Sequence, residues 1–128
     1  MKSAKSPCVD VKDLSCEDKL RAAGDSLYVI GGKWKLPLMI ALGQGHTRFN
    51  DLQRTIDGIS SKVLARELKE LEINGFVVRK VDASATPVLV EYQLTDYSSS
   101  LQEIVYALIS WGTAHRARIK QSRLSDRV

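Results

Sequence analysis

The stretch RFNDLQRTIDGISSKVLARELKELEINGFVVRK, residues 48–80, decides the fold of this chain. Two apolar stripes at helical spacing run through it: Phe49, Leu52 and Ile56, then Leu64, Leu68 and Leu71. Gly58 separates the stripes, and Asn74-Gly75 is a typical helix stop. An apolar run that ends in two basic residues follows. The order predicts two helices joined by a tight turn and then a strand, which is a helix-turn-helix with the start of a β-wing.

Capping residues place the starts of these two helices. Thr47 is expected as the N-cap of the first helix and Ser60 as the N-cap of the second, because their hydroxyls can accept a hydrogen bond from a free backbone N–H. Ile59 is expected to pack against Leu64 as a hydrophobic staple. We therefore expect the second helix over residues 60–74.

The rest of the chain supplies helices at both ends and a second strand. Helices are expected over residues 16–30, 34–42 and 99–120, and strands over residues 76–81 and 89–94. Pro37 is tolerated only in a first helical turn, so the second of these helices should begin at Lys35 or Leu36. Thr95 or Asp96 is expected to cap the last helix. The predicted fold class is mainly α with a small β-hairpin (α+β), a winged helix-turn-helix with N- and C-terminal dimerisation helices. Its divisions are a mobile arm (1–15), the domain (16–120) and a basic tail (121–128).

Composition indicates a globular binding protein in the cytoplasm. The apolar share is 44%, no run is long enough for a membrane span, and the N-terminus lacks the apolar centre of a signal peptide. The net charge is +4, unevenly distributed. Residues 44–80 carry 7 Lys and Arg against 5 Asp and Glu, residues 81–111 carry 0 against 4, and residues 112–128 carry 5 against 1. A polyanion would therefore meet the helix-turn-helix or the C-terminal tail rather than the wing.

Double-stranded DNA is the ligand that this pattern favours. A recognition helix exposes short polar and basic side chains near its N-terminus while its other face packs on the domain. The candidate DNA-binding residues are Arg48, Arg54, Ser60, Ser61, Lys62, Arg66, Lys69, Arg79 and Lys80. The alternative is an ordinary surface helix with ion pairs four residues apart, such as Arg66–Glu70. In the DNA interpretation Glu67, Glu70 and Glu72 should face away from the duplex.

The terminal helices predict a homodimer. Their candidate interface residues are apolar and recur at helical spacing: Leu20, Leu27, Leu101, Ile104, Val105, Leu108 and Trp111. The alternative is that this stripe covers the core of its own domain. Two-fold symmetry would present two recognition helices to successive major grooves of a pseudo-palindromic operator, about 34 Å apart.

Several motifs together resemble one known family. IGGKW at 30–34, RFNDL at 48–52, GISSKVLARELKELEINGFVVR at 58–79, VEYQLT at 90–95 and Trp111 are similar to the HxlR-type family of bacterial transcription regulators. The resemblance implies a dimeric winged helix-turn-helix protein that binds operator DNA. It also implies that residues 60–69 form the reading helix and that the loop 82–88 is the tip of the wing.

The chain departs from this family at the cysteine and in the wing. Members often carry Cys-Pro about a dozen residues before the IGGKW tryptophan, and some use that thiol as a sensor, whereas Arg21 stands in that neighbourhood here. Cys8 and Cys16 lie further upstream and are expected to be reduced thiols at rest, or alternatively a redox switch. A basic residue often stands directly before VEY in the family, and in this chain Leu89 occupies that position.

Signals for catalysis, metals and cofactors are lacking. His46 and His115 have no carboxylate or cysteine at ligand spacing, and no nucleophile stands at a motif spacing from a base. We therefore expect neither an enzyme, nor a metal site, nor a cofactor. A winged helix used as a protein-interaction module remains the other alternative to a DNA-binding regulator. A small-molecule effector between the head and the dimer helices is possible, but the sequence specifies none.

Overall fold

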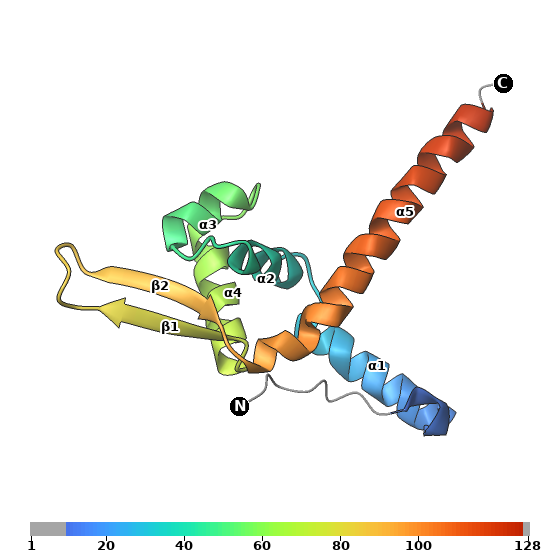
Figure 1. Ribbon diagram of the computed structural model, residues 1–128, viewed down its shortest axis with the longest axis horizontal. Helices are drawn as coiled ribbons and strands as arrows, with labels where there is room; N and C mark the ends of the chain where they lie inside the picture. Colours follow the sequence, from blue (N-terminus) through green and yellow to red (C-terminus); the bar gives the residue numbers. More distant parts are fainter. Residues whose placement is uncertain (1–9, 127–128) are drawn as a thin grey trace.

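The computed structural model describes residues 10–126, and Cys8 lies outside them (Figure 1). Its elements follow in the order η1 (Val11–Asp13), α1 (Cys16–Ile30), α2 (Lys35–Gly43), α3 (Phe49–Thr55), α4 (Ser61–Ile73), β1 (Val77–Asp82), β2 (Leu89–Leu94), η2 (Tyr97–Leu101) and α5 (Gln102–Asp126), where η marks a 3-10 helix. The expected mainly α fold with a β-hairpin is confirmed. No helix within residues 10–126 is long and apolar enough to cross a membrane.

The core lies in the head, which we define as α2, α3, α4 and the β1–β2 hairpin. Its fully buried side chains are leucines from three helices: Leu38, Leu52, Leu64, Leu68 and Leu71. The hairpin extends to one side of the head, whereas α1 and α5 project away on the other side (Figure 1). The head therefore has a complete core without the outer parts of the two terminal helices.

The start of α4 follows the prediction, and the start of α3 does not. The Ser60 hydroxyl accepts the backbone N–H of Val63 at 3.1 Å, as an N-cap should. In contrast, α3 begins at Phe49 with Arg48 in the cap position and no side-chain cap. Thr47 instead joins the head to the wing, because its carbonyl accepts the N–H of Tyr92 at 2.8 Å and its hydroxyl donates to Glu91 at 3.3 Å. The expected Thr47 cap was therefore wrong.

The wing is an antiparallel hairpin that directly follows α4. Gly75, at φ +84°, ends that helix, and the Phe76 N–H donates to the Leu71 carbonyl at 2.9 Å. The register pairs Val77 with Leu94 and Asp82 with Leu89. Strand β1 begins at Val77, one residue later than predicted, because Phe76 is a core residue stacked on Tyr97.

The C-terminal helix is longer than predicted. Tyr97–Leu101 forms η2, whose N-cap position is Asp96 without a side-chain cap, and the Thr95 hydroxyl just before it accepts the Ser98 N–H at 3.3 Å. Helix α5 then runs from Gln102 to Asp126 rather than ending near Lys120. The first six residues of the expected basic tail, 121–126, therefore continue the helix.

Candidate nucleic-acid interface

Helix α4 presents a polar and basic stripe to solvent. Lys62, Arg66 and Lys69 stand four and three residues apart, which places them on one face of the helix, and all three are exposed. The opposite face carries the buried leucines of the core. The predicted division of this helix into an inward apolar face and an outward basic face is thus present in the structure.

The two serines at the N-terminus of α4 have different roles. The Ser60 hydroxyl is used as the helix cap, and its oxygen accepts from Val63. The Ser61 hydroxyl donates to the side-chain carbonyl of Gln53 on α3 at 3.2 Å. Both residues are exposed, so the first turn of α4, with its free N–H groups, is open to an anion such as a phosphate.

Two of the three acidic residues of α4, Glu67 and Glu70, contact the domain through Lys35 of α2. The Glu67 side chain is buried, with 9% of its surface exposed, whereas 44% of the Glu70 side chain is exposed. The Lys35 ammonium, itself 12% exposed, donates to Glu67 Oε1 at 2.8 Å and to Glu70 Oε1 at 2.6 Å. The expected Arg66–Glu70 pair does not form; Arg66 Nη2 instead lies 3.5 Å from Glu67 Oε2. The carboxylates are therefore neutralised behind the basic stripe.

Lys35, Glu67 and Glu70 form an ion triad, and their contacts shift the pKa values of Lys35 and Glu70. Burial lowers the pKa of Lys35, but the hydrogen bonds that Lys35 donates to Glu67 and Glu70, together with the negative charges of these carboxylates, outweigh burial, and the pKa lies above its ordinary value. The hydrogen bond from Lys35, with its charge, lowers the pKa of Glu70. Lys35 and Glu70 are therefore ionised at neutral pH, and the contacts of Lys35 with Glu67 and Glu70 tie α2 to the C-terminal half of α4.

Arg48 and Arg54 flank α3 on the exposed side of the head. Arg48 stands at the N-cap position, and Arg54 in the last turn lies 3.6 Å from Asp51 through Nη2. Asp51 also contacts His46 Nδ1 at 2.7 Å. Both arginines are exposed, as contacts to a DNA backbone require.

Arg79 and Lys80 are neighbours on β1, and both are exposed. Successive side chains of a strand point to opposite faces, so the hairpin offers one of the two to each of its faces. Lys80 pairs in register with Glu91, whereas Arg79 pairs with Tyr92. Asp82 is the last residue of β1, and its carboxylate accepts the Ser84 hydroxyl at 2.6 Å and the Ser84 N–H at 3.1 Å; these bonds lower the pKa of Asp82.

Comparison with known proteins decides the family. Residues 29–120 match the family model described as HxlR-like helix-turn-helix. This chain belongs to the HxlR-like helix-turn-helix family. It is 38% identical over 94 residues to the HTH-type transcriptional regulator YtcD of Bacillus subtilis, covering 73% of this chain and 74% of that one. The predicted class, a helix-turn-helix transcription regulator, is confirmed.

Solved structures agree with this assignment. The redox regulator HypR in its reduced form matches with a TM-score of 0.72 and 36% identity, over 78% of this chain and 98% of that one. The reduced form of the transcriptional regulator YodB from B. subtilis matches with a TM-score of 0.62 and 36% identity, over 77% and 91%. The winged-helix fold of this HxlR-like chain is therefore shared with transcription regulators.

The terminal helices of this HxlR-like protein leave much of the predicted apolar stripe uncovered. Leu27 on α1 is 67% exposed and Trp111 on α5 is 66% exposed, and Leu20, Ile104 and Leu108 are exposed as well. Two members of the predicted set differ. Leu101 is half-buried against the core of its own head, and half-buried Val105 lines a cavity between α5 and the head.

The HxlR-like chain has one thiol within its described residues. Cys16 is the first residue of α1 and is exposed. In residues 10–126 no group of three His, Cys, Asp or Glu side chains is placed to hold a metal ion.

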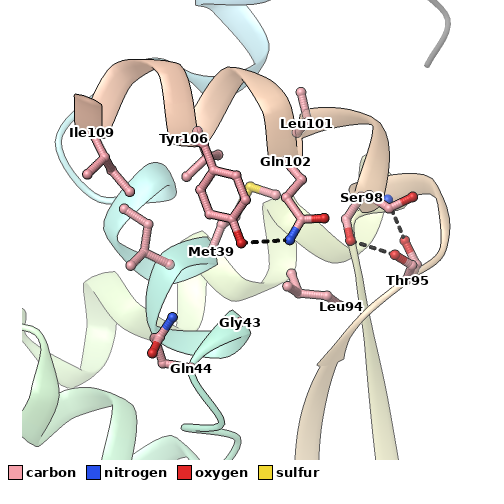
Figure 2. Close-up of a pocket in the computed structure, with 13 residues that line it drawn as sticks. Met39, Gly43, Gln44, Leu94, Thr95, Ser98, Leu101, Gln102, Tyr106 and Ile109 are labelled. Carbon is pink, nitrogen blue, oxygen red and sulfur yellow. Dashed lines mark hydrogen bonds between the residues drawn. The ribbon is translucent and has the colours of Figure 1, made fainter. Parts of the chain in front are cut away.

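A cavity beside α5 is a feature whose lining residues could not be predicted from the sequence. It is about 260 Å³ and lies between α2, the end of β2, η2 and the first turns of α5 (Figure 2). Its polar side chains include Gln44, Gln102 and Tyr106. No local motif could have identified it, because its walls come from segments about 60 residues apart in the chain.

Proposed function

We propose that this protein is a homodimeric transcription regulator that binds a pseudo-palindromic operator, with α4 in the major groove of double-stranded DNA. The observation that carries the proposal is the exposed basic stripe of α4 on a helix whose other face is fully buried. Such a helix can enter a groove without uncovering its own core.

Charge placement supports DNA as the ligand of this face. Lys62 and Arg66 are close enough to the N-terminus of α4 to reach base edges, and Lys69 lies one turn further on. Glu67 and Glu70 would repel phosphates if exposed, but Lys35 holds both carboxylates on the domain side. We assign Arg48, Arg54, Ser60 and Ser61 to phosphate contacts that set the register of the protein on the duplex, with Arg79 and Lys80 as further contacts from the hairpin.

The uncovered faces of α1 and α5 support the homodimer. An extended apolar face is costly in water and marks an interaction surface. A second copy of the chain offers the same apolar face, so a two-fold axis would bury both at once. In the dimer we expect contacts from Leu20, Leu27, Ile104, Leu108 and Trp111, with Leu101 and Val105 at the margin.

Selection of duplexes from a random pool by the purified full chain tests DNA binding, and the selected site also reveals its symmetry. We expect Lys62→Ala and Arg66→Ala each to weaken binding, and Arg66→Ala to relax base preference at one position by about 1–3 kcal/mol. Lys12→Ala removes the same charge from an exposed position in η1, outside both basic regions, and is the matched control. If no duplex is selected at low salt, or both α4 variants bind as the unmodified protein does, the proposal fails.

Sedimentation equilibrium tests the homodimer. Leu27→Asp and Leu108→Asp should shift the protein toward the monomer, because each places a charge on the apolar face. Val88→Asp changes an exposed apolar residue in the loop of the wing and should leave the association unchanged. Equal association of all three variants would contradict the assignment of the interface to α1 and α5.

A thiol response is a second candidate function. Among the solved structures similar to this chain, HypR is a redox regulator, and YodB was also solved after diamide treatment. In this chain Cys16 is exposed. Mass spectrometry after mild diamide treatment should then reveal a disulfide or adduct that is lost in Cys16→Ser. Thiols that stay unmodified would remove this candidate.

Binding of a partner protein without any affinity for DNA would instead favour the interpretation of this winged helix as a protein-interaction module.

A further inference from the structure

The cavity beside α5 has a distinct chemical character. Among the described residues that line it, none is Asp, Glu, Lys, Arg or His. Met39, Leu94 and Ile109 supply apolar walls from α2, β2 and α5 (Figure 2). Tyr106 is 60% exposed, so the cavity opens to solvent beside it, and a charged ligand that gave up part of its hydration there would gain no counter-charge. The site therefore favours uncharged molecules.

One pair of polar side chains can orient a ligand in this cavity. The Gln102 side-chain amide donates to the Tyr106 hydroxyl at 2.9 Å, as Figure 2 shows. This bond leaves the Tyr106 O–H as a donor and the Gln102 carbonyl as an acceptor. The hydroxyls at the other end of the cavity are already used, because Ser98 Oγ donates to the Thr95 carbonyl at 2.5 Å and Thr95 Oγ1 accepts from Ser98 N–H.

The size of the cavity limits the ligand further. Pockets for drug-sized ligands measure roughly 300–1,000 Å³, and this one is slightly smaller at about 260 Å³. One or two rings with a single polar substituent match both the volume and the Gln102–Tyr106 pair.

We propose that this cavity is an effector site for a small uncharged ring compound that carries a hydroxyl, amide or carbonyl group. The regulatory half of this inference rests on the proposed DNA-binding function. An occupant touches α2 of the head and α5 at the same time, and η2, which leads directly into α5, also lines the cavity. A ligand that prefers one angle between head and α5 therefore shifts the spacing of the two recognition helices in a dimer.

Titration of the full-length ¹⁵N-labelled protein with four probes of similar size tests the site. Phenol and benzamide are uncharged at pH 7, whereas benzoate and benzylamine carry opposite charges. We expect the uncharged pair to shift the Gln102 side-chain amide and the backbone N–H groups of Met39 and Leu94 in a saturable way. The charged pair should bind at least about tenfold more weakly.

Two variants locate the binding within the cavity. Gly43 lines it, and a Cβ there would meet Leu94 Cδ1 only at 3.8 Å, so Gly43→Leu can extend into the space and should abolish binding. Tyr106→Phe keeps the ring, removes the hydroxyl and should weaken both uncharged probes by about 3- to 10-fold. Tyr28→Phe, an exposed tyrosine outside the cavity, is the matched control. A thermal melt verifies that Gly43→Leu is folded. If Gly43→Leu is unfolded, the result for Tyr106→Phe alone decides the test.

The outcomes separate this inference from the proposed function. Equal binding of charged and uncharged probes, or no effect of either cavity variant, would overturn the site. Binding that appears only after dilution to the monomer would also overturn it, because a second copy then fills the cavity. If the uncharged probes bind but change affinity for the selected duplex less than about fivefold, the regulatory half fails. If no duplex is bound at all, the proposed function fails and the ligand site stands.

Discussion

Replacement of Lys35 by methionine removes the centre of the buried ion triad and should destabilise the protein strongly. The Lys35 side chain is 12% exposed, and its ammonium lies within 2.8 Å of carboxylate oxygens of both Glu67 and Glu70. Methionine has a similar volume and no charge, so the substitution leaves the shape of the site nearly intact. The change therefore reports the loss of the charge rather than the opening of a cavity.

The expected loss of stability depends on how much hydration and counter-charge Glu67 and Glu70 retain after Lys35 is removed. Breaking a fully buried ion pair by removing one partner costs about 3–5 kcal/mol, since the other charge stays buried. Here the cost is smaller for two reasons: Glu70 is 44% exposed, and Arg66 Nη2 at 3.5 Å partly compensates Glu67. We expect Lys35→Met to lower the free energy of unfolding by about 2–3 kcal/mol.

Urea unfolding at one fixed protein concentration measures this effect, followed by circular dichroism and by tryptophan fluorescence. The double variant Lys35→Met with Glu67→Met should recover most of the loss, because it removes the uncompensated charge as well. Arg54→Met makes the same kind of substitution in an exposed pair and should cost about 0.5 kcal/mol or less. A Lys35→Met protein within about 0.5 kcal/mol of the unmodified one would refute the reasoning, as would a double variant less stable than the single.

Three further predictions concern α4 and its ends. Ser60→Ala should lower stability by about 1 kcal/mol in urea unfolding through loss of the N-cap, whereas Ser61→Ala should change it less. Gly75→Ala should cost about 1–2 kcal/mol in the same assay, since alanine is strained at φ +84°. The lowered pKa of Glu70 stabilises the protein at pH values above the unfolded pKa, and this stabilisation is lost as pH falls through the folded pKa. A series of melts between pH 7 and pH 3 should therefore show a flatter acid limb for Glu70→Gln than for Glu72→Gln.

Much of the head could be predicted from the sequence because its signals are local. The apolar spacing and the serine cap place α4 within one residue, and α1 begins and ends where its pattern does. The family motifs predict the same winged helix. In each case the information lies within about one helix length, which is the range over which propensity and capping act.

The features that were missed depend on residues far apart in the chain. The burial of Glu67 needs Lys35, 32 residues earlier, and the sequence alone favoured a pair within the helix, Arg66–Glu70. Thr47 looked like a cap, but its partners are Glu91 and Tyr92 on β2. Such pairings arise from the packing of whole elements, so no window of sequence contains them.

From the distribution of charge we expect α4 and the pairing of two protomers to be the two sources of operator affinity in the proposed complex. On the wing, Lys80 faces Glu91 across the hairpin, and residues 81–111 carry four acidic side chains and no Lys or Arg. A hairpin of this kind adds little positive potential. In the proposed complex we therefore expect the phosphate-dependent part of binding to depend on the stripe of Lys62, Arg66 and Lys69, together with Arg48 and Arg54. One such helix reads only a few base pairs. A longer site therefore requires two heads at a fixed spacing, and α1 and α5, with their uncovered apolar faces, are the elements that can set it.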